Sequence, residues 1–432
     1  MLTYEQATAW IKNKSPRGID LGLQRVEWLL QELGNPERLA SFVHIGGTNG
    51  KGSTLTFLQK ILIESNTCVG SFTSPSLTNY NEHIGVNGIP ISNEDFTDLV
   101  SIIQPVSDRM EQETGWPPAT EFEIITVMMF YYFGMVKEVD LVLVEVGLGG
   151  RMDSTNVLNP LISIITNVGL DHTNILGGTV EEIAKEKAGI IKDDSYLIIG
   201  SKRQEVIEIL MAEAEKRKSQ ILALNQDFSV EKQSNGFSYS FKEESIKVLS
   251  VSMVGSHQLE NAALAITASL ILRDRFDFPI SENSIRTGIQ KAKWKGRFEV
   301  LSDEPCIIID GAHNEDGMNS LVDTLKQQYP NEKFIFLAAA LQDKDYSKML
   351  SIMNTISDQF IFTQFVNGRV LSAESLSQAS KAENKLIIED WKEALQYGIQ
   401  NARNGNILVI TGSLYFLSQV RPIILNSLEI QE

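Results

Sequence analysis

The 432-residue sequence contains two cysteines and no dense run of lysine and arginine. Cys68 and Cys306 lack the paired spacing of a zinc site or a redox motif, so we expect them to be thiols buried in the core. The 38 basic and 55 acidic residues give a formal charge of −17, which argues against a nucleic-acid-binding surface. An anionic substrate must therefore meet a locally cationic pocket.

Long hydrophobic runs are also missing. No stretch approaches 18 consecutive apolar residues, and residues 1–15 carry polar and charged groups throughout, so the sequence predicts neither a membrane span nor a signal peptide. With 43% hydrophobic residues, it is typical of a globular cytoplasmic protein. Its length exceeds what one hydrophobic core usually supports, so we expect two domains, possibly three.

The most informative segment is residues 47–53, which read GTNGKGS. It follows the apolar run 42–45 and precedes the amphipathic stretch 54–64. Backbone N–H groups of such a turn point at an anion, the helix N-terminus adds a partial positive charge, and Lys51 can reach terminal phosphates. The segment therefore predicts a nucleotide site.

The match is to a variant of the P-loop. Ile45 and Gly52 stand where the strict pattern requires a glycine and a hydroxyl, and the hydroxyl is displaced to Ser53. The alternative is a glycine-rich turn that only packs a helix onto a sheet.

The first 220 or so residues alternate apolar runs with helical patterns, which is typical of a parallel sheet covered on both faces. Short alternating segments at about 221–251 predict a few antiparallel strands. The expected parallel strands are 42–45, 68–72, 141–146, 162–166 and 196–199.

A second alternation follows two helical patterns, at 257–275 and 281–293. We therefore predict an α/β protein: a P-loop-containing, doubly wound, mostly parallel sheet with a small antiparallel patch in residues 1–295, and a smaller Rossmann-like domain in 296–432. The expected strands of the second domain are 306–309, 333–340, 359–363 and 407–410.

Polar residues follow several of these strands, where an open α/β sheet binds its ligands. Glu145 ends an apolar strand and is a candidate metal ligand, although it could instead pair with Arg151. The glycines near it do not form a dinucleotide fingerprint, because Met152 occupies the third glycine position. His172 lies at the next strand end, where a metal ligand and a structural histidine are both possible.

Two lysines, Lys185 and Lys187, lie on a helix that begins near Thr179, among acidic residues. Such a charge run is usually a solvated helix face, and composition does not choose between the two lysines.

In the second half, Asp310 and His313 occupy a strand-to-helix junction and could face a nucleotide or a metal; Asp310 could instead be a helix N-cap. Residues 340–345 and 411–413 place further polar groups at strand ends. These strand ends predict a single polar rim.

Taken together, these motifs resemble the folylpolyglutamate synthase and dihydrofolate synthase family, a branch of the Mur ligase superfamily. The resemblance covers nearly the whole chain and includes the extra Gly52, since cell-wall ligases usually place Thr or Ser directly after the lysine. The twelve ordered matches are 22–25, 47–53, 73–75, 120–123, 145–156, 169–173, 185–192, 257–262, 294–297, 310–314, 343–345 and 411–416.

The resemblance implies an ATP- and Mg²⁺-dependent amide ligase with its active site in a cleft between the two domains. It implies ATP contacts from Asn49, Gly50, Lys51, Gly52, Ser53, Asn261, Arg297 and Asp310. It implies that the metal is bound by Ser74, Glu145, His172 and Lys187, the last as a carbamylated lysine. It also implies that the pterin is bound by Thr120, Phe122 and Asp153. Lys51, Lys187, His172, Asp310 and His313 are the implied catalytic residues.

We expect a folate γ-carboxylate to take the γ-phosphoryl group of ATP and then react with the amine of L-glutamate; the same steps on dihydropteroate would make dihydrofolate. Three alternative functions are a cell-wall ligase, a P-loop kinase or GTPase, and a non-catalytic nucleotide-binding module. Cell-wall ligases have an additional N-terminal domain, for which the roughly 40 residues before residue 42 leave no room. We expect a monomer with small-molecule substrates and neither nucleic-acid nor membrane partners.

Two positions depart from the family pattern. Glu315 replaces a common proline, which should alter only the start of a helix. Residues 338–340 replace a common glycine with alanines, which could tighten the glutamate pocket.

Overall fold

The computed structural model describes residues 2–14, 20–357 and 359–427. The chain divides into two compact units. The first comprises residues up to Val168, Thr179–Val251 and Glu260–Ala292; the second comprises Gly169–Gly178, Ser252–Leu259 and the chain from Lys293 onward. Two segments of the predicted first domain, Gly169–Gly178 and Ser252–Leu259, thus cluster with the second unit. No helix in the described ranges has the length and apolar composition that a membrane span requires.

The first unit contains an eight-stranded sheet in the order β4-β3-β2-β5-β1-β6-β7-β8. Neighbours from β2 to β8 pair in parallel, and β3 and β4 add an antiparallel edge. This confirms the predicted mostly parallel, doubly wound sheet. The strands are β1 (Phe42–Gly46), β2 (Val69–Phe72), β3 (Ile84–Val86), β4 (Ile89–Pro90), β5 (Leu141–Glu145), β6 (Ile162–Ile165), β7 (Tyr196–Ile199) and β8 (Gln220–Ala223).

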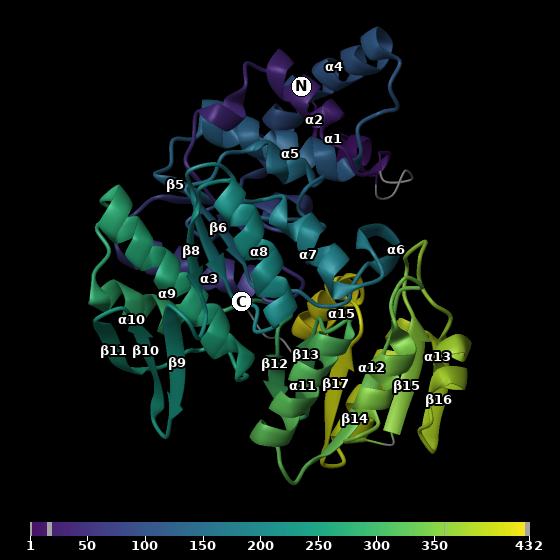
Figure 1. The fold of residues 1–432 in the computed structure, drawn as a ribbon. Helices are drawn as coiled ribbons and strands as arrows, with labels where there is room; N and C mark the ends of the chain where they lie inside the picture. Colours follow the sequence, from purple (N-terminus) through teal and green to yellow (C-terminus); the bar gives the residue numbers. More distant parts are fainter. Residues whose placement is uncertain (1, 15–19, 358, 428–432) are drawn as a thin grey trace. The chain divides into compact units, whose positions relative to one another are not determined.

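Helices α1, α2, α4 and α5 gather on one side of this unit (Figure 1). Their core includes Phe42, Phe72 and Val144 of the sheet, which are buried against them. The helices of the unit are α1 (Tyr4–Lys12), α2 (Gln24–Glu32), α3 (Lys51–Glu64), α4 (Asn93–Thr114), α5 (Glu121–Tyr131), α7 (Val180–Ala188), α8 (Gln204–Lys216), α9 (His257–Phe276) and α10 (Glu282–Lys291), with short turns η2 (Pro36–Arg38), η3 (Tyr80–His83), η4 (Tyr132–Val136) and η5 (Ser154–Val157).

The predicted antiparallel patch is a three-stranded sheet of β9 (Phe228–Gln233), β10 (Gly236–Phe241) and β11 (Glu244–Leu249). Its start is later than predicted, because β8 pairs in parallel with β7 and extends the main sheet. A four-residue strand gives too little pattern to distinguish the two cases.

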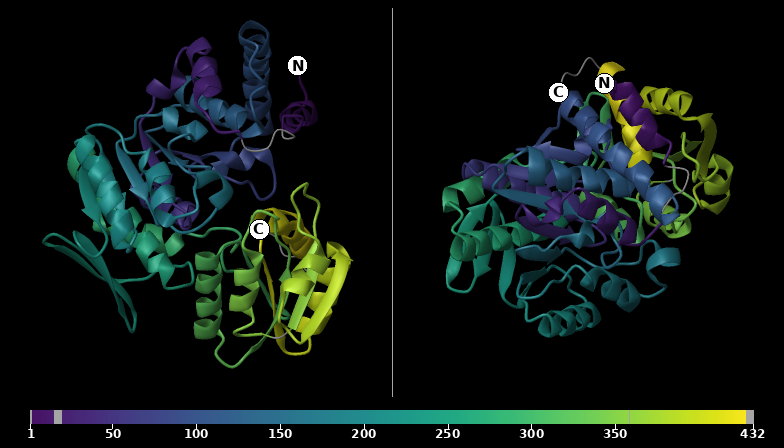
Figure 2. Two further views of the ribbon diagram at one scale, coloured as in Figure 1. Left: turned by 45° about the vertical axis from the view of Figure 1, so that its right-hand side comes forward. Right: turned by 90° about the horizontal axis from the view of Figure 1, so that it is seen from above.

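The second unit contains a six-stranded sheet in the order β12-β13-β17-β14-β15-β16, parallel except for β12. Helices cover both faces of this sheet (Figure 2). One core lies under α11, α12 and α13, and the other lies under α14 and α15, as the Rossmann-like prediction requires. The elements are β12 (Glu299–Asp303), β13 (Cys306–Asp310), β14 (Lys333–Ala338), β15 (Gln359–Gln364), β16 (Asn384–Asp390), β17 (Asn406–Thr411), α6 (Thr173–Leu176), α11 (Glu315–Gln328), α12 (Tyr346–Met353), α13 (Ala373–Ala379), α14 (Trp391–Ala402) and α15 (Leu414–Ser427).

The prediction that both thiols are buried in the core is wrong. Cys68 and Cys306 are free and only partly buried. Cys68 directly precedes β2 and Cys306 is the first residue of β13, so both lie where a strand begins rather than at its buried centre.

Candidate active site

The glycine loop connects β1 to α3 with its glycines in close contact with neighbouring side chains. Gly50 adopts φ 82° as the N-cap of α3, and a Cβ there would lie 2.4 Å from Asn261 Oδ1. A Cβ on Gly47 would lie 1.9 Å from Thr166 Oγ1. The helix begins at Lys51 rather than at the predicted residue 54, so Ser53 lies in its buried first turn. The loop therefore leaves backbone N–H groups and a helix N-terminus to receive phosphate.

The end of β6 holds this loop in place. Asn167 accepts hydrogen bonds from Thr48 N (3.0 Å, to its backbone oxygen) and Asn49 N (2.8 Å, to Oδ1). Thr166 Oγ1 donates to the backbone oxygen of Asn49 at 2.6 Å. Thr166 and Asn167 were not predicted as site residues, although Thr166 ends a predicted strand and Asn167 lies between that strand and the 169–173 motif.

Lys51 and Glu145 meet beside the loop. Lys51 Nζ lies 3.3 Å from the backbone oxygens of Gly47 and Thr48 and 3.9 Å from Glu145 Oε1. Glu145 is 5% exposed and accepts a hydrogen bond from Ser74 N at 3.4 Å. The alternative pairing of Glu145 with Arg151 is wrong, because Arg151 pairs with Glu186 (2.6 Å).

The buried carboxylate of Glu145 suits Mg²⁺, a hard cation that favours carboxylate and hydroxyl oxygens. Within the described ranges, no group of three or more His, Cys, Asp and Glu side chains is arranged to hold a metal ion by itself. Mg²⁺ is usually held by one or two carboxylates together with substrate phosphates, so a single buried carboxylate beside a phosphate loop fits it.

The structure distinguishes the two lysines of α7. Lys187 is 3% exposed, whereas Lys185 is exposed. The last turn of α7 packs against the glycines of the 145–156 motif: a Cβ on Gly150 would lie 3.0 Å from Lys187 Cα, and one on Gly189 would lie 2.4 Å from Arg151 Cα. Full burial of a lysine is rare, which marks Lys187 as a functional candidate.

The expected pterin-side residues lie near one another in the first unit. Thr120 caps α5, and the Phe122 ring lies close to Gly147, where a Cβ would fall 2.4 Å from Phe122 Cζ. Asp153 is 2% exposed and accepts a hydrogen bond from Leu148 N at 2.7 Å. Residues 147–148 therefore connect Phe122 with Asp153.

In the second unit, Asp310 ends β13 and fixes the start of the following loop. It accepts hydrogen bonds from Phe298 N (2.7 Å) and Ala312 N (2.8 Å). The N-cap of α11 is Asn314, so the alternative of Asp310 as an N-cap is wrong. Arg297 approaches the same loop, since a Cβ on Gly311 would lie 2.9 Å from Arg297 Nη1.

Asp171 is the centre of a buried charged cluster that was not predicted. Its carboxylate pairs with Lys344 Nζ (2.6 Å) and accepts a hydrogen bond from Asn314 Nδ2 (3.1 Å), with His313 Nε2 at 3.4 Å. Burial alone would raise the pKa of Asp171, but the hydrogen bond with His313 and the charge of Lys344 hold it well below its usual range. The cluster brings together three segments that are far apart in the sequence, and each belongs to one of the family motifs, 169–173, 310–314 and 343–345.

His172 lies beside this cluster with its backbone in the left-handed region, at φ 48°. Its Nε2 is 3.2 Å from Lys344 Nζ and its Nδ1 is 3.7 Å from Asp343 Oδ2. Burial, followed by the charge of Lys344, lowers the pKa of His172 to about 4. The ring is therefore neutral near pH 7, the form in which imidazole binds metals.

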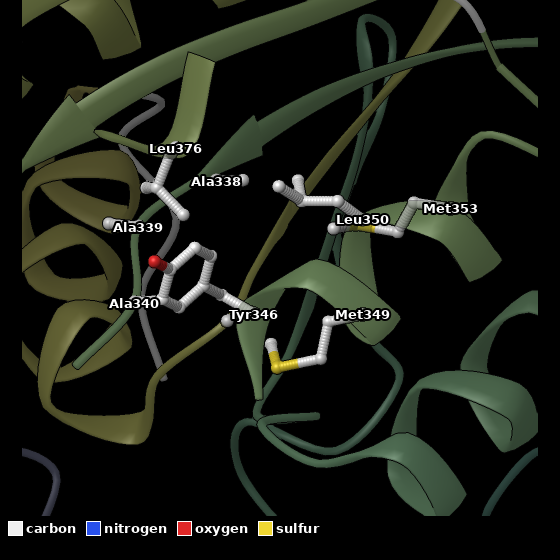
Figure 3. Close-up of a pocket in the computed structure, with 9 residues that line it drawn as sticks. Ala338, Ala339, Ala340, Tyr346, Met349, Leu350, Met353 and Leu376 are labelled. Atoms are coloured by element: carbon white, nitrogen blue, oxygen red, sulfur yellow. The ribbon is translucent and has the colours of Figure 1, made fainter. Parts of the chain in front are cut away.

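The departures from the family pattern have local effects. Glu315 is the first residue of α11 and pairs with Lys348 at 3.1 Å. The alanines that end β14 line a small apolar hollow with Tyr346 and residues of α12 (Figure 3). A Cβ on Gly412 would lie 2.3 Å from the backbone oxygen of Ala339, so β17 and β14 are tightly packed there.

Comparisons with known proteins define the class. Residues 118–269 match the Mur ligase middle domain, and residues 296–414 match the Mur ligase glutamate ligase domain. The fold and both matches make the chain an ATP-dependent ligase of the Mur type.

The family follows from full-length relatives. The chain is 40% identical over 424 residues to the dihydrofolate synthase/folylpolyglutamate synthase of Bacillus subtilis (97% of this chain, 98% of the relative) and 35% identical over 430 residues to the folylpolyglutamate synthase of Lacticaseibacillus casei (98% and 99%). The Mycobacterium tuberculosis folylpolyglutamate synthase complexed with ADP and AMPPCP superimposes with a TM-score of 0.90 at 27% identity, covering 98% of this chain and 99% of that one. The chain belongs to the folylpolyglutamate synthase and dihydrofolate synthase family.

Proposed function

We propose that this protein joins L-glutamate to the γ-carboxylate of a folate at the expense of ATP. The observation that carries the proposal is the glycine loop with Lys51 and the buried carboxylate of Glu145 beside it. The folate carboxylate attacks the γ-phosphorus and ADP leaves, giving an acyl phosphate. The amine of glutamate then adds to the acyl carbon, and the tetrahedral intermediate expels phosphate and loses a proton.

The chain's own residues contribute mainly position and charge. Residues 49–53 bind the ATP phosphates, chiefly through the backbone N–H groups at the start of α3, and Lys51 offsets the charge that develops on the transferred group. Ser74, Glu145 and His172 would hold Mg²⁺, which supplies further charge neutralisation when bound. We assign nucleotide contacts to Asn261, Arg297 and Asp310, with His313 and a carbamylated Lys187 as further catalytic groups.

We further propose a first domain of residues 1–295 and a second domain of residues 296–432. We also propose a monomeric enzyme, since one chain carries every residue assigned to the reaction, and a cytoplasmic location.

A bifunctional enzyme is the second candidate. The proximity of Phe122 and Asp153 through residues 147–148 favours it, because these residues match the pterin side of relatives that bind dihydropteroate. In this reading the benzoate carboxyl of dihydropteroate takes the place of the folate carboxylate.

One assay tests both candidates. Incubation with ATP, Mg²⁺, glutamate and either tetrahydrofolate or dihydropteroate should release ADP and phosphate and lengthen the acceptor by one glutamate, as mass spectrometry will show. Product from one acceptor alone decides between the monofunctional and bifunctional enzymes. Turnover of neither acceptor refutes the proposal.

Replacement of each lysine on α7 should show that Lys187, and not Lys185, contributes to catalysis. We expect Lys187→Ala to lower kcat at least about 100-fold, because the carbamate that would stabilise charge at the site is lost. Formate should restore part of the activity by supplying a carboxylate in the vacated space. Lys185→Ala is the matched control and should be nearly neutral, since Lys185 is exposed.

The modification itself is measured by ¹³C NMR of protein equilibrated with ¹³C-bicarbonate. A carbamate signal present in the parent protein and absent from Lys187→Ala is expected. Its absence from both would remove the carbamate from the mechanism.

A further inference from the structure

His44 is a buried histidine that the proposed chemistry does not use. It lies within β1, three residues before Gly47, and is 0% exposed. Its Nε2 is 2.8 Å from Thr155 Oγ1, whereas its Nδ1 has no hydrogen-bond partner. A buried polar atom without a hydrogen-bond partner lowers the free energy of unfolding, so the presence of a half-satisfied ring in the centre of a sheet needs an explanation. We look for it in the one hydrogen bond that the ring does make.

That bond leads to Asp153. Thr155 donates to Asp153 Oδ1 from its hydroxyl and from its backbone N, the latter at 3.0 Å. The other carboxylate oxygen, Oδ2, accepts from Leu148 N at 2.7 Å. The His44–Thr155–Asp153 chain therefore runs from the strand before the glycine loop to the loop that follows β5.

Counting hydrogens sets the direction of this chain. Thr155 has one hydroxyl hydrogen, and the Asp153 carboxylate, which accepts from two backbone N–H groups, is the acceptor for it. Thr155 Oγ1 must then accept from His44, so the ring proton is on Nε2 and Nδ1 is a bare nitrogen.

The opposite tautomer would be worse on two counts. Two acceptors would compete for one hydroxyl hydrogen, and a buried N–H would be left without an acceptor at Nδ1. The ring is also uncharged, because burial, followed by the charge of Lys192, lowers the pKa of His44 to about 3.

The chain ends at the groups assigned to the acceptor substrate. By holding Leu148 N, Asp153 fixes the backbone beside Gly147, against which the Phe122 ring lies. The glycine loop is held separately, by Thr166 and Asn167.

We infer that His44 and Thr155 are positioning residues for recognition of the pterin-bearing substrate, acting through Asp153 and residues 147–148 on Phe122. This rests on the proposed function, since it presumes that Phe122 and Asp153 face the pterin ring. The inference treats the two substrates separately. The His44–Thr155–Asp153 hydrogen bonds order the pterin side, whereas Thr166 and Asn167 hold the glycine loop on the ATP side.

The experiment compares Thr155→Val, which keeps the shape and removes the hydroxyl, with Thr155→Ser, which keeps the hydroxyl. Thr155→Val should raise the KM and Kd for tetrahydrofolate roughly tenfold or more, the effect of one hydrogen bond to a charged acceptor, with little change in the KM for ATP. Thr155→Ser should be close to the parent protein. Calorimetry with tetrahydrofolate measures the Kd without turnover.

A spectroscopic measurement tests the proton assignment independently. In ¹⁵N-histidine-labelled protein, the resonance that disappears in His44→Gln should show the proton on Nε2 and should not titrate between pH 5 and pH 8. A proton on Nδ1 would overturn the inference.

The remaining outcomes are also decisive. Unchanged tetrahydrofolate affinity in Thr155→Val, or equal losses for ATP and tetrahydrofolate, would overturn the positioning role. If the parent protein itself binds ATP but neither tetrahydrofolate nor dihydropteroate, the proposed function fails and the inference falls with it. That result is distinguishable because it appears before any substitution is made.

Discussion

Lys51→Met should lower kcat by about 10²–10³-fold while weakening ATP binding much less. The ammonium lies 3.3 Å from two carbonyl oxygens of the glycine loop and 3.9 Å from Glu145 Oε1. In the proposed mechanism, it is held where negative charge builds up as the phosphoryl group is transferred. In the same mechanism, ATP binding relies mainly on backbone N–H groups and the start of α3, which the substitution leaves in place.

The measurement is ADP release under saturating substrates, together with the Kd for ATP by calorimetry. Lys60→Met is the matched control, because Lys60 lies near the far end of the same helix. We expect it to leave kcat nearly unchanged. A kcat for Lys51→Met within tenfold of the parent value would contradict the assigned role.

The parallel strands could be predicted because they are buried on both faces. The burial pattern of β1 and β5 is continuous, so each appears in the sequence as an uninterrupted apolar run. The edge strand β16 was not predicted, since most of its residues are exposed and its apolar run is only three residues long, 386–388. Strand prediction thus succeeded where burial determines sequence.

Helical periodicity could have identified Lys187, although composition could not. The buried residues of α7 are Val180, Ile183, Ala184, Lys187 and Ala188, which recur at the spacing of one helix face. Lys185 falls off that face. A lysine in line with apolar residues is the signal that the flanking acidic residues obscured.

The Asp171 cluster had no comparable signal. Its partners Asn314 and Lys344 are 143 and 173 positions away, and pairing over such distances depends on topology rather than local pattern. Predicting a polar rim from strand ends placed 310–314 and 343–345 together in the second unit. It could not show that Asp171, from a segment expected in the first domain, joins them.

Lys344→Met should destabilise the second unit by about 3–5 kcal/mol, because it leaves the buried Asp171 carboxylate without its nearest cation. The side chains of Lys344 and Asp171 are only 6% and 10% exposed. The folded-state pKa of Asp171 is depressed, so its ionic contribution is present above the unfolded pKa of about 3.9 and is lost as the pH falls through the folded value. The loss in Lys344→Met should therefore be fully expressed at pH 7 and should shrink in acid.

Amide hydrogen exchange of β13 and β17 measures this loss within the second unit alone. Lys348→Met is the matched control, since it breaks an ion pair with Glu315 in the same unit whose side chains are 51% and 44% exposed. Exposed pairs contribute about 0–1 kcal/mol, so exchange in that variant should hardly change. Equal effects of the two substitutions would show that burial does not strengthen the dependence of Asp171 on Lys344. A loss confined to Lys344→Met would establish Asp171 as the group that joins residues 169–178 to the second unit, with His172 held at its side.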